Sequence, residues 1–318
     1  MIEKQTPQQE TGAMSGPVTG AFGGLQATGI DLSRVRSKKR LRRDERVFLW
    51  ISRVIIIAFA LVILFPLVMV IDASVTPGQT FFVTSVIPQT VSLEHYQNVF
   101  DPSKTPIGTW LKNSAIVCLV TSGLSVLLVT GMAYAFSRFR FFGRKYGLMS
   151  LLLIQMFPAQ MSFVALYYLL NYVHLLDSLS GLIVVFLGGG IPFNAWLFKG
   201  YIDGLPRDLE EAAYVDGATQ FQAFWKVILP LTRPMMAVIF IFQTIGIYND
   251  YILTNYLITD SGKYTVAVGL YGFLNAQFGQ NWNDFAAGAV IATIPIAVLF
   301  LVAQRWLVSG LASGAVKG

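Results

Sequence analysis

The sequence has little charge, one cysteine and two histidines, and each shortage excludes a class of protein. Asp, Glu, Lys and Arg make up 13% of the 318 residues, whereas about a quarter of an ordinary soluble domain is charged. The single cysteine, Cys118, excludes an intramolecular disulfide and any metal centre built from several cysteines. His95 and His174 leave little material for histidine chemistry. We therefore expect neither a soluble domain nor a metalloenzyme.

The motifs of nucleotide-binding proteins and hydrolases are also missing. A phosphate loop of the form G-x-x-x-x-G-K-[ST] is absent, since Leu257 stands where the first glycine before Gly262 and Lys263 would be. No H-E-x-x-H or G-x-S-x-G motif occurs either. We expect no enzymatic activity, no catalytic or metal-ligating residue and no cofactor bound by this chain.

Long apolar runs dominate the sequence, which is 54% hydrophobic with a mean hydropathy of +0.59. A helix needs about 20 mostly apolar residues to cross the hydrocarbon core of a membrane. The runs that qualify are 47–71, 110–136, 147–171, 179–199, 235–258 and 285–308. The sequence predicts an all-α, multi-pass membrane protein with six transmembrane helices, formed by residues 47–318. Residues 1–46 form a basic tail that we expect to be disordered.

Lysine and arginine gather before the first span, between the second and third, and between the fourth and fifth. By the positive-inside rule these segments and both termini are cytoplasmic. The net charge of +6 is therefore a topology signal, and we expect no nucleic-acid partner. The cluster from Arg34 to Arg46 could bind a regulator, although attraction to anionic lipid explains it more simply.

The polar segment 200–233 is patterned as two short helices. Pro206 suits a first helical turn, Glu210 and Glu211 place negative charge near the positive end of the helix dipole, and Gly217 suits a left-handed stop. A first helix is predicted at about 206–216. Its small residues, Ala212 and Ala213, would let another protein approach closely, so the segment is either a docking element or a plain connector.

A second helix should follow, because Thr219 and Gln222 have the spacing of a capping box. Four apolar residues then fall at helical spacing on one face: Phe221, Phe224, Trp225 and Ile228. We expect an amphipathic helix that lies flat on the membrane and ends at Pro230.

Candidate pathway-lining residues are the polar side chains that interrupt apolar spans: Gln155, Tyr248, Asn249 and Asp250. Prolines also recur inside the spans, and such breaks survive in membranes only where neighbouring helices or a wet cavity satisfy the freed backbone groups. Asp250 is the one clear carboxylate at depth, and a structural role for it is equally consistent with the sequence. Since the spans are otherwise nearly free of charge, the energy for any transport should come from another protein.

Several motifs resemble one family. Glu211-Ala212-Ala213, three residues, Gly217, nine residues and Val227-Ile228-Leu229-Pro230 resemble the EAA signature of permease subunits of bacterial ABC importers, although Val227 stands where isoleucine is usual. Other runs are similar to carbohydrate-importer permeases, and most of all to MalG-type subunits of maltose/maltodextrin importers: AYAFSR at 133–138, QMFPA at 155–159, YNDY at 248–251, DFAAGAV at 284–290 and QRWLVSGLASGAVKG at 304–318.

The resemblance implies the type I ABC importer permease fold in the bacterial cytoplasmic membrane. It implies a second, MalF-type permease subunit, two ATPase subunits that bind ATP and Mg, and an extracytoplasmic sugar-binding protein. The ATPase-coupling residues carried over are Glu210, Glu211, Ala212, Ala213, Asp216, Gly217, Leu229 and Pro230. Contacts of 309–318 with the ATPase and of 259–283 with the binding protein are also implied. Among sugars it favours maltose or maltodextrin over related oligosaccharides. The alternative is a self-contained secondary carrier or channel.

Overall fold

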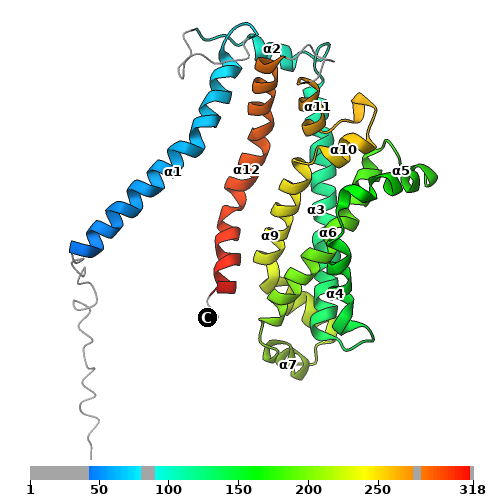
Figure 1. The fold of residues 1–318 in the computed structure, drawn as a ribbon. Coiled ribbons are helices and arrows are strands. Elements are labelled where there is room, and N and C mark those ends of the chain that lie inside the picture. The colour runs from blue at the N-terminus through cyan, green and yellow to red at the C-terminus, as the bar shows by residue number, and fades with distance from the viewer. Residues whose placement is uncertain (1–42, 80–89, 275–280, 316–318) are drawn as a thin grey trace, which may run out of the picture. The chain divides into compact units, whose positions relative to one another are not determined.

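The computed structural model describes residues 43–79, 90–274 and 281–315, and throughout these ranges the regular structure is helical. The chain divides into two compact units, 1–59 and 60–318. The longest elements are α1 (Arg43–Val75), α3 (Ile107–Arg138), α6 (Leu179–Asp203), α9 (Leu229–Tyr248) and α12 (Trp282–Ala315). Within the second unit, α3 lies beside both α6 and α9 (Figure 1). The predicted basic tail lies almost wholly outside the described residues.

Among the described residues, five helical segments are long and apolar enough to cross a membrane: Arg43–Val75, Ile107–Arg138, Leu179–Asp203, Gln220–Tyr248 and Trp282–Gln304. A sixth is formed by two helical pieces, α4 (Arg144–Gln155) and Ala159–Tyr172, which contains η2 (Ala159–Ser162) and α5 (Phe163–Tyr172). The prediction of six spans is consistent with this arrangement if the two pieces count as one.

The prediction of one continuous helix at 147–171 is wrong. The two pieces meet at an angle of 87° around Met156–Pro158. Pro158 has no N–H to donate to a preceding turn, and its ring forces the residue before it away from helical geometry. The chain therefore turns sharply where the sequence pattern alone looked continuous.

The fifth predicted span, 235–258, is also shifted. The helical run begins at Gln220 and α9 ends at Tyr248, after which α10 (Ile252–Leu257) forms a separate short helix. Asn249 donates its side-chain N–H to the carbonyl of Ile245, so it closes the last turn of α9. The polar residues at 249–250 therefore separate two helices.

Buried apolar side chains form separate clusters along α3. One lies towards its C-terminal end and joins α3, α6 and α9 through residues such as Val129, Phe198 and Ile239. Another lies towards its N-terminal end, where Trp110 packs with Val266 of α11 (Val266–Gly272) and with Ala287 of α12. One buried hydroxyl of α3 is bonded across helices: Thr244 of α9 donates its hydroxyl to that of Ser122 at 2.9 Å, a contact of the kind that joins membrane helices.

Polar contacts join α1, α12 and α2 (Glu94–Phe100) at the other end of the bundle from α7 (Figure 1). His95 of α2 lies 2.7 Å from Asp284 of α12 through its Nδ1 and 3.0 Å from the carbonyl of Thr76 through its Nε2. Asn283 donates to the carbonyls of Ala73 and Thr76. These contacts hold the last turn of α1 and the first turn of α12 together.

Candidate functional site

The segment 200–233 contains a short helix, α7 (Asp208–Val215), at one end of the second unit (Figure 1). Its first turn carries three carboxylates, which are favourable near the positive end of a helix dipole. The chain leaves α7 through Gly217 at a φ of +82°, and Ala218 donates its N–H to the carbonyl of Ala213. This is the left-handed stop that the sequence predicted, and the predicted helix at 206–216 is confirmed with slightly shorter bounds.

The predicted capping box is also confirmed. Thr219 accepts a hydrogen bond from the N–H of Gln222, whose side chain accepts one from the N–H of Thr219. The helix that starts here does not end at Pro230, so the prediction of a separate flat helix is wrong. It continues through α8 (Gln220–Ala223) and the π-helical turn η3 (Phe224–Ile228) into α9. The π turn shifts the hydrogen-bond register just before Pro230. Pro230, which has no backbone N–H, therefore lies in the first turn of α9, where a proline is tolerated and does not end the helix.

The two neighbouring glutamates of α7 point in different directions. Glu210 is 4% exposed and turned into the protein, so its carboxylate lies away from the open surface. Glu211 is exposed. Of the other predicted coupling residues, Ala212, Asp216 and Gly217 are exposed, and Ala213, Leu229 and Pro230 are half-buried. The open surface of α7 therefore carries Glu211, Ala212 and Asp216.

The last turn of α3 contacts the start of this segment, a relationship that sequence reasoning missed. Tyr134 donates its hydroxyl to Oε1 of Glu210 at 2.9 Å, and Arg138 donates its Nε to Oε2 at 2.5 Å. Ser137 donates to Asp203, the last residue of α6, at 2.6 Å. All three donors belong to the run AYAFSR at 133–138. Their spacing places Tyr134 and Arg138 on one face of a helix, which was the signal available in the sequence.

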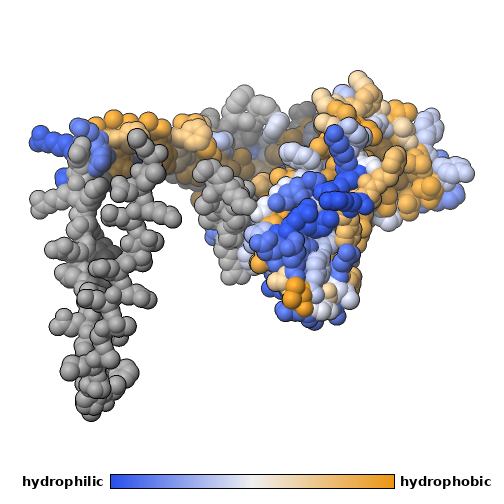
Figure 2. All heavy atoms as spheres, turned by 90° about the horizontal axis from the view of Figure 1, so that it is seen from below, coloured by the Kyte–Doolittle hydropathy of each residue, from blue (hydrophilic) through white to orange (hydrophobic). Residues whose placement is uncertain are grey.

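Positive charge concentrates at the α7 end of the second unit, where Figure 2 shows hydrophilic side chains bordered by hydrophobic surface. Within residues 90–274, the basic residues at this end are Arg138, Arg140, Arg144, Lys145, Lys199, Arg207, Lys226 and Arg233. At the opposite end the basic residues of the described ranges are Lys104, Lys112 and Lys263. The charge distribution along the bundle is therefore asymmetric.

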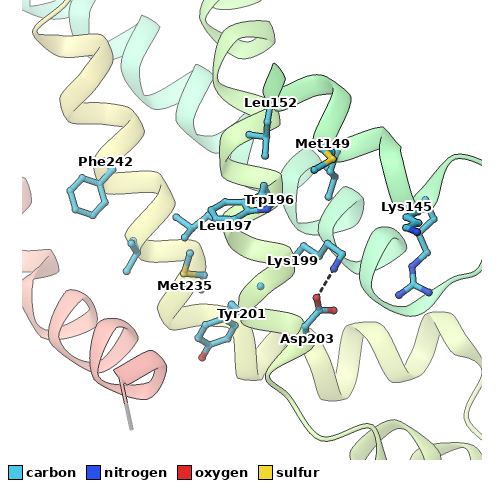
Figure 3. A pocket seen from close by; sticks show the side chains of 14 residues that line it. Lys145, Met149, Leu152, Trp196, Leu197, Lys199, Tyr201, Asp203, Met235 and Phe242 are labelled. Carbon is cyan, nitrogen blue, oxygen red and sulfur yellow. Dashed lines mark hydrogen bonds and ion pairs between the residues drawn. The ribbon is translucent and has the colours of Figure 1, made fainter. Parts of the chain in front are cut away.

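A cavity of about 730 Å³ opens at this end between α4, α6 and α9. Its interior is apolar, with Met149, Leu152 and Trp196 along the wall (Figure 3). Lys199 lines it too and forms an ion pair of 2.5 Å with Asp203. The cavity therefore has an apolar body and a charged rim.

A second cavity, of about 530 Å³, lies between α5, α6 and α9. Three consecutive glycines, 188–190, leave room for it, and Gln243 and Asp250 add polar groups to its wall. Asn194 donates to the side-chain oxygen of Gln243 at 2.9 Å. Neither Asn194 nor Gln243 was predicted, although both are amides within apolar spans.

The four predicted lining residues do not converge on this cavity. Asp250 lines it, and Gln155 lies nearby because it donates to the carbonyl of Gly189 at 2.5 Å. Tyr248 instead lines an apolar crevice between α3, α9 and α12 and donates its hydroxyl to the carbonyl of Ala292 at 2.7 Å. Asn249 caps the end of α9. Asp250 and Gln155 thus remain candidates for a lining role.

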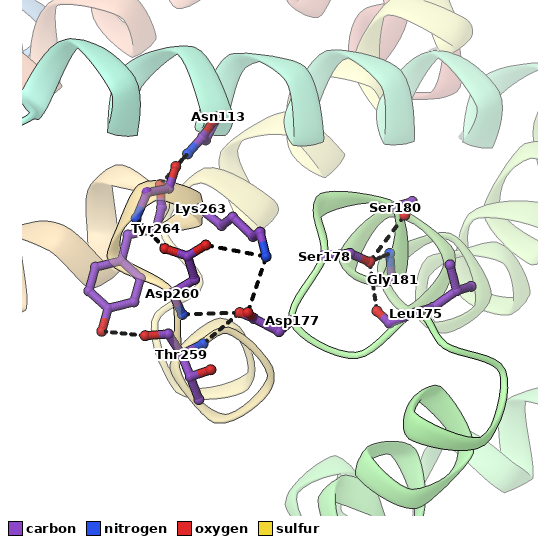
Figure 4. A network of polar contacts seen from close by, with 11 residues as sticks. Asn113, Leu175, Asp177, Ser178, Ser180, Gly181, Thr259, Asp260, Lys263 and Tyr264 are labelled. Atoms are coloured by element: carbon purple, nitrogen blue, oxygen red, sulfur yellow. Dashed lines mark hydrogen bonds and ion pairs between the residues drawn. The ribbon is translucent and has the colours of Figure 1, made fainter.

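A polar network joins the segment just before α6 to the segment just after α10 (Figure 4). Asp177 accepts hydrogen bonds from the N–H groups of Thr259 and Asp260. It also forms an ion pair with Lys263, with 3.2 Å between Nζ and Oδ2. Desolvation opposes ionisation of Asp177, but these hydrogen bonds and the lysine outweigh it and hold the pKa of the carboxyl below its usual value. Hydrogen bonds to Asp177 and Asp260 raise the pKa of Lys263.

Comparison with known proteins places these features in one family. Residues 127–313 match the family described as the binding-protein-dependent transport system inner membrane component. The chain is 39% identical over 280 residues to the galactooligosaccharides transport system permease protein GanQ of Bacillus subtilis (strain 168), covering 88% of this chain and 98% of that protein. It is 42% identical over 293 residues to the maltose/maltodextrin transport system permease protein MalG of Photorhabdus laumondii, covering 87% and 98%.

A solved structure is also similar. The crystal structure of a bacterial ABC transporter involved in the import of the acidic polysaccharide alginate contains a chain that matches with a TM-score of 0.70 and 25% identity, over 84% of this chain and 99% of that one. The fold, the short helix α7 with its glycine stop at Gly217 and the sequence similarity all indicate the same family. This chain belongs to the family of binding-protein-dependent transport system inner membrane components, the permease subunits of ABC importers.

Proposed function

We propose that this chain forms half of the translocation pathway of an ATP-driven, binding-protein-dependent importer of maltose, maltodextrin or a related oligosaccharide. The partners would be a second, MalF-type permease subunit, two ATPase subunits and an extracytoplasmic sugar-binding protein. ATP and Mg bind the ATPase subunits, and this chain transmits their motion without performing catalysis itself. The observation that carries the proposal is the outer surface of α7.

That surface is suited to docking because it combines short side chains with exposed carboxylates. Ala212 is exposed and lets another backbone approach α7 closely, and the exposed Glu211 and Asp216 offer negative charge to a basic or hydrogen-bonding group of the partner. We expect the two half-buried residues at the start of α9, Leu229 and Pro230, to support the same surface.

The charge asymmetry supports an orientation in the membrane. Within residues 90–274, eight basic residues lie at the α7 end and three at the other, so we expect from the positive-inside rule that α7 lies in the cytoplasm. Both termini then lie on the cytoplasmic side of the bacterial inner membrane. The network around Asp177 and the contacts of α2 face outward, on the side from which a binding protein delivers sugar.

The sugar is proposed from similarity. Relatives named for maltose/maltodextrin and for galactooligosaccharides are about equally similar to this chain. We favour maltose or maltodextrin because the runs QMFPA, DFAAGAV and the C-terminal sequence match MalG-type subunits. Calorimetry of the cognate binding protein with maltose, maltotriose and galacto-oligosaccharides would identify the sugar.

Reconstitution in proteoliposomes tests the transporter assignment. The chain and its cognate permease partner are reconstituted with and without the ATPase subunits, and uptake of labelled sugar is measured with binding protein outside and ATP inside. We expect uptake only in the complete assembly with ATP. Uptake by this chain alone, driven by an ion gradient or by the sugar gradient, would establish the alternative of a secondary carrier or channel.

A further inference from the structure

We propose that Arg138 and Glu210 form a joint through which α7 moves α3, and that Arg138 is a positioning residue for the coupling of ATP hydrolysis to transport. The proposal rests on the proposed function, since it needs an ATPase that acts on α7. It concerns the inner side of α7, opposite the surface proposed for docking.

The joint consists of two charged side chains that are both removed from water. The side chain of Arg138 is 7% exposed and that of Glu210 is 5% exposed, with 2.5 Å between Nε and Oε2. The hydroxyl of Tyr134 occupies the other carboxylate oxygen at 2.9 Å. Both oxygens of Glu210 are therefore bound by residues one helical turn apart on α3, which fixes the carboxylate in position and in rotation.

The same turn of α3 holds the chain on either side of α7. Arg138 donates its Nη2 to the carbonyl of Leu205, in the turn that leads into α7, at 3.1 Å. The ring of Tyr134 packs on Phe224 of η3, with 4.7 Å between centroids. The end of α3 thus contacts the segment before α7, α7 itself and the segment after it.

The backbone connections of α7 are less suited to transmitting a displacement. The helix has only eight residues, a glycine precedes it at 204, and Gly217 follows it with a left-handed φ. Glycine has few backbone restraints, so the connection after α7 can bend, whereas the connection before it is held to α3 by Arg138. A buried ion pair, in contrast, resists separation because each charge would be left unpaired out of water. A push on α7 therefore reaches α3 through Arg138 and Glu210.

A charge-to-amide series tests the joint in the full assembly. Arg138→Gln, Glu210→Gln and the double variant are purified with partner permease and ATPase subunits and reconstituted. The readout is the ratio of ATP hydrolysis with sugar-loaded binding protein to hydrolysis without it, together with sugar imported per ATP. A merely structural role would change the yield of the assembly and leave both ratios unchanged. Arg140→Gln is the matched control, because it removes an exposed arginine two residues away.

We expect each single variant to lose about tenfold in the stimulation ratio and in sugar imported per ATP. The double variant should recover part of the loss, because two amides can bond each other without leaving a buried charge, and Arg138→Lys should lie between wild type and Arg138→Gln. Arg140→Gln should behave as wild type. Wild-type ratios in Arg138→Gln and Glu210→Gln would overturn the joint. A single variant that does not assemble is replaced by Arg138→Lys, whose wild-type ratios would equally overturn it.

The two proposals fail in different ways. If the wild-type chain neither retains the ATPase subunits nor supports stimulated hydrolysis, the proposed function is wrong. If the wild type is stimulated and the variants are stimulated equally, only the joint is wrong.

Discussion

Asp250 accepts two hydrogen bonds from Thr254, one from the backbone N–H at 2.9 Å and one from the hydroxyl at 2.8 Å. The carboxylate thereby satisfies an N–H of the first turn of α10, which would otherwise lack an acceptor. The same residue lines the cavity between α5, α6 and α9. The side chain of Asp250 therefore both caps α10 and lines the cavity, so the two roles that the sequence left open are compatible.

Substitution separates the two roles of Asp250. Asp250→Asn retains an acceptor for Thr254 and should leave thermal stability in detergent nearly unchanged, whereas Asp250→Ala should lose about 1 kcal/mol of stability. If the charge matters to the pathway, Asp250→Asn will change the rate of uptake at normal assembly. Normal uptake by a stable Asp250→Asn chain would leave only the capping role.

The outer surface of α7 is tested by Glu211→Lys. Because the partner surface is expected to be positive, the substitution brings like charges together at a cost of several kcal/mol. The ATPase subunits should no longer co-purify through a tag on this chain, while the spans remain inserted. Glu211→Gln is the control that removes the charge without reversing it, and full retention of ATPase and of stimulated hydrolysis by Glu211→Lys would mean that α7 is only a connector.

Gly217→Val tests the stop after α7 by a different route. A Cβ at this position meets no atom within 4 Å, so space is available and the strain lies in the backbone, whose φ is +82°. A residue with a side chain in that conformation costs about 1–2 kcal/mol. We expect loss of sugar-stimulated hydrolysis in Gly217→Val and near-normal activity in Gly217→Asn, because asparagine tolerates a left-handed conformation. Equal activity of both variants would contradict the prediction.

Gly269 allows the close approach of α11 to α3. A Cβ at Gly269 would lie 2.2 Å from the ring of Trp110, which is 1% exposed and unable to move aside. Gly269→Ala should therefore destabilise the chain by about 1–3 kcal/mol, measured as a lower unfolding temperature in detergent. Gly123→Ala, at a helical position with open space, is the control and should be neutral. An unchanged unfolding temperature for Gly269→Ala would show that the two helices are less tightly packed.

The lowered pKa of Asp177 predicts that the folded chain loses stability at acidic pH. Its pKa is lowered in the folded chain, so its contribution is present above the unfolded pKa of about 3.9 and is lost as the pH falls through the lower folded value. The pKa of Lys263 is raised, so its contribution is full below about 10.4 and is lost only as the pH rises through the higher folded value. Stability from this network should be flat around neutral pH. Thermal unfolding of wild type and Asp177→Asn as a function of pH checks this: the variant should show a smaller acid-side loss than wild type, and a loss near neutral pH that the variant abolishes would contradict the sign.

Much of the fold followed from local sequence. Apolar runs located the membrane helices, because hydropathy acts within one segment of the chain. The capping box at Thr219 and the stop at Gly217 were also predictable, since each depends on residues at most a few positions apart. The errors arose where local signals conflicted: Pro158 broke a span that looked continuous, and Pro230 did not end a helix because a π turn preceded it.

The roles of individual polar residues were decided by the tertiary structure. Sequence alone determined that 206–217 is a short acidic helix with a glycine stop, and the family signature identified it. The sequence placed both Glu210 and Glu211 on the coupling surface and did not reveal that one of them faces inward. Only the packing of α7 on α3 buries one against Arg138, 72 positions away, and leaves the other exposed. Contacts between distant positions depend on how helices pack, and no periodicity along one helix encodes its partner.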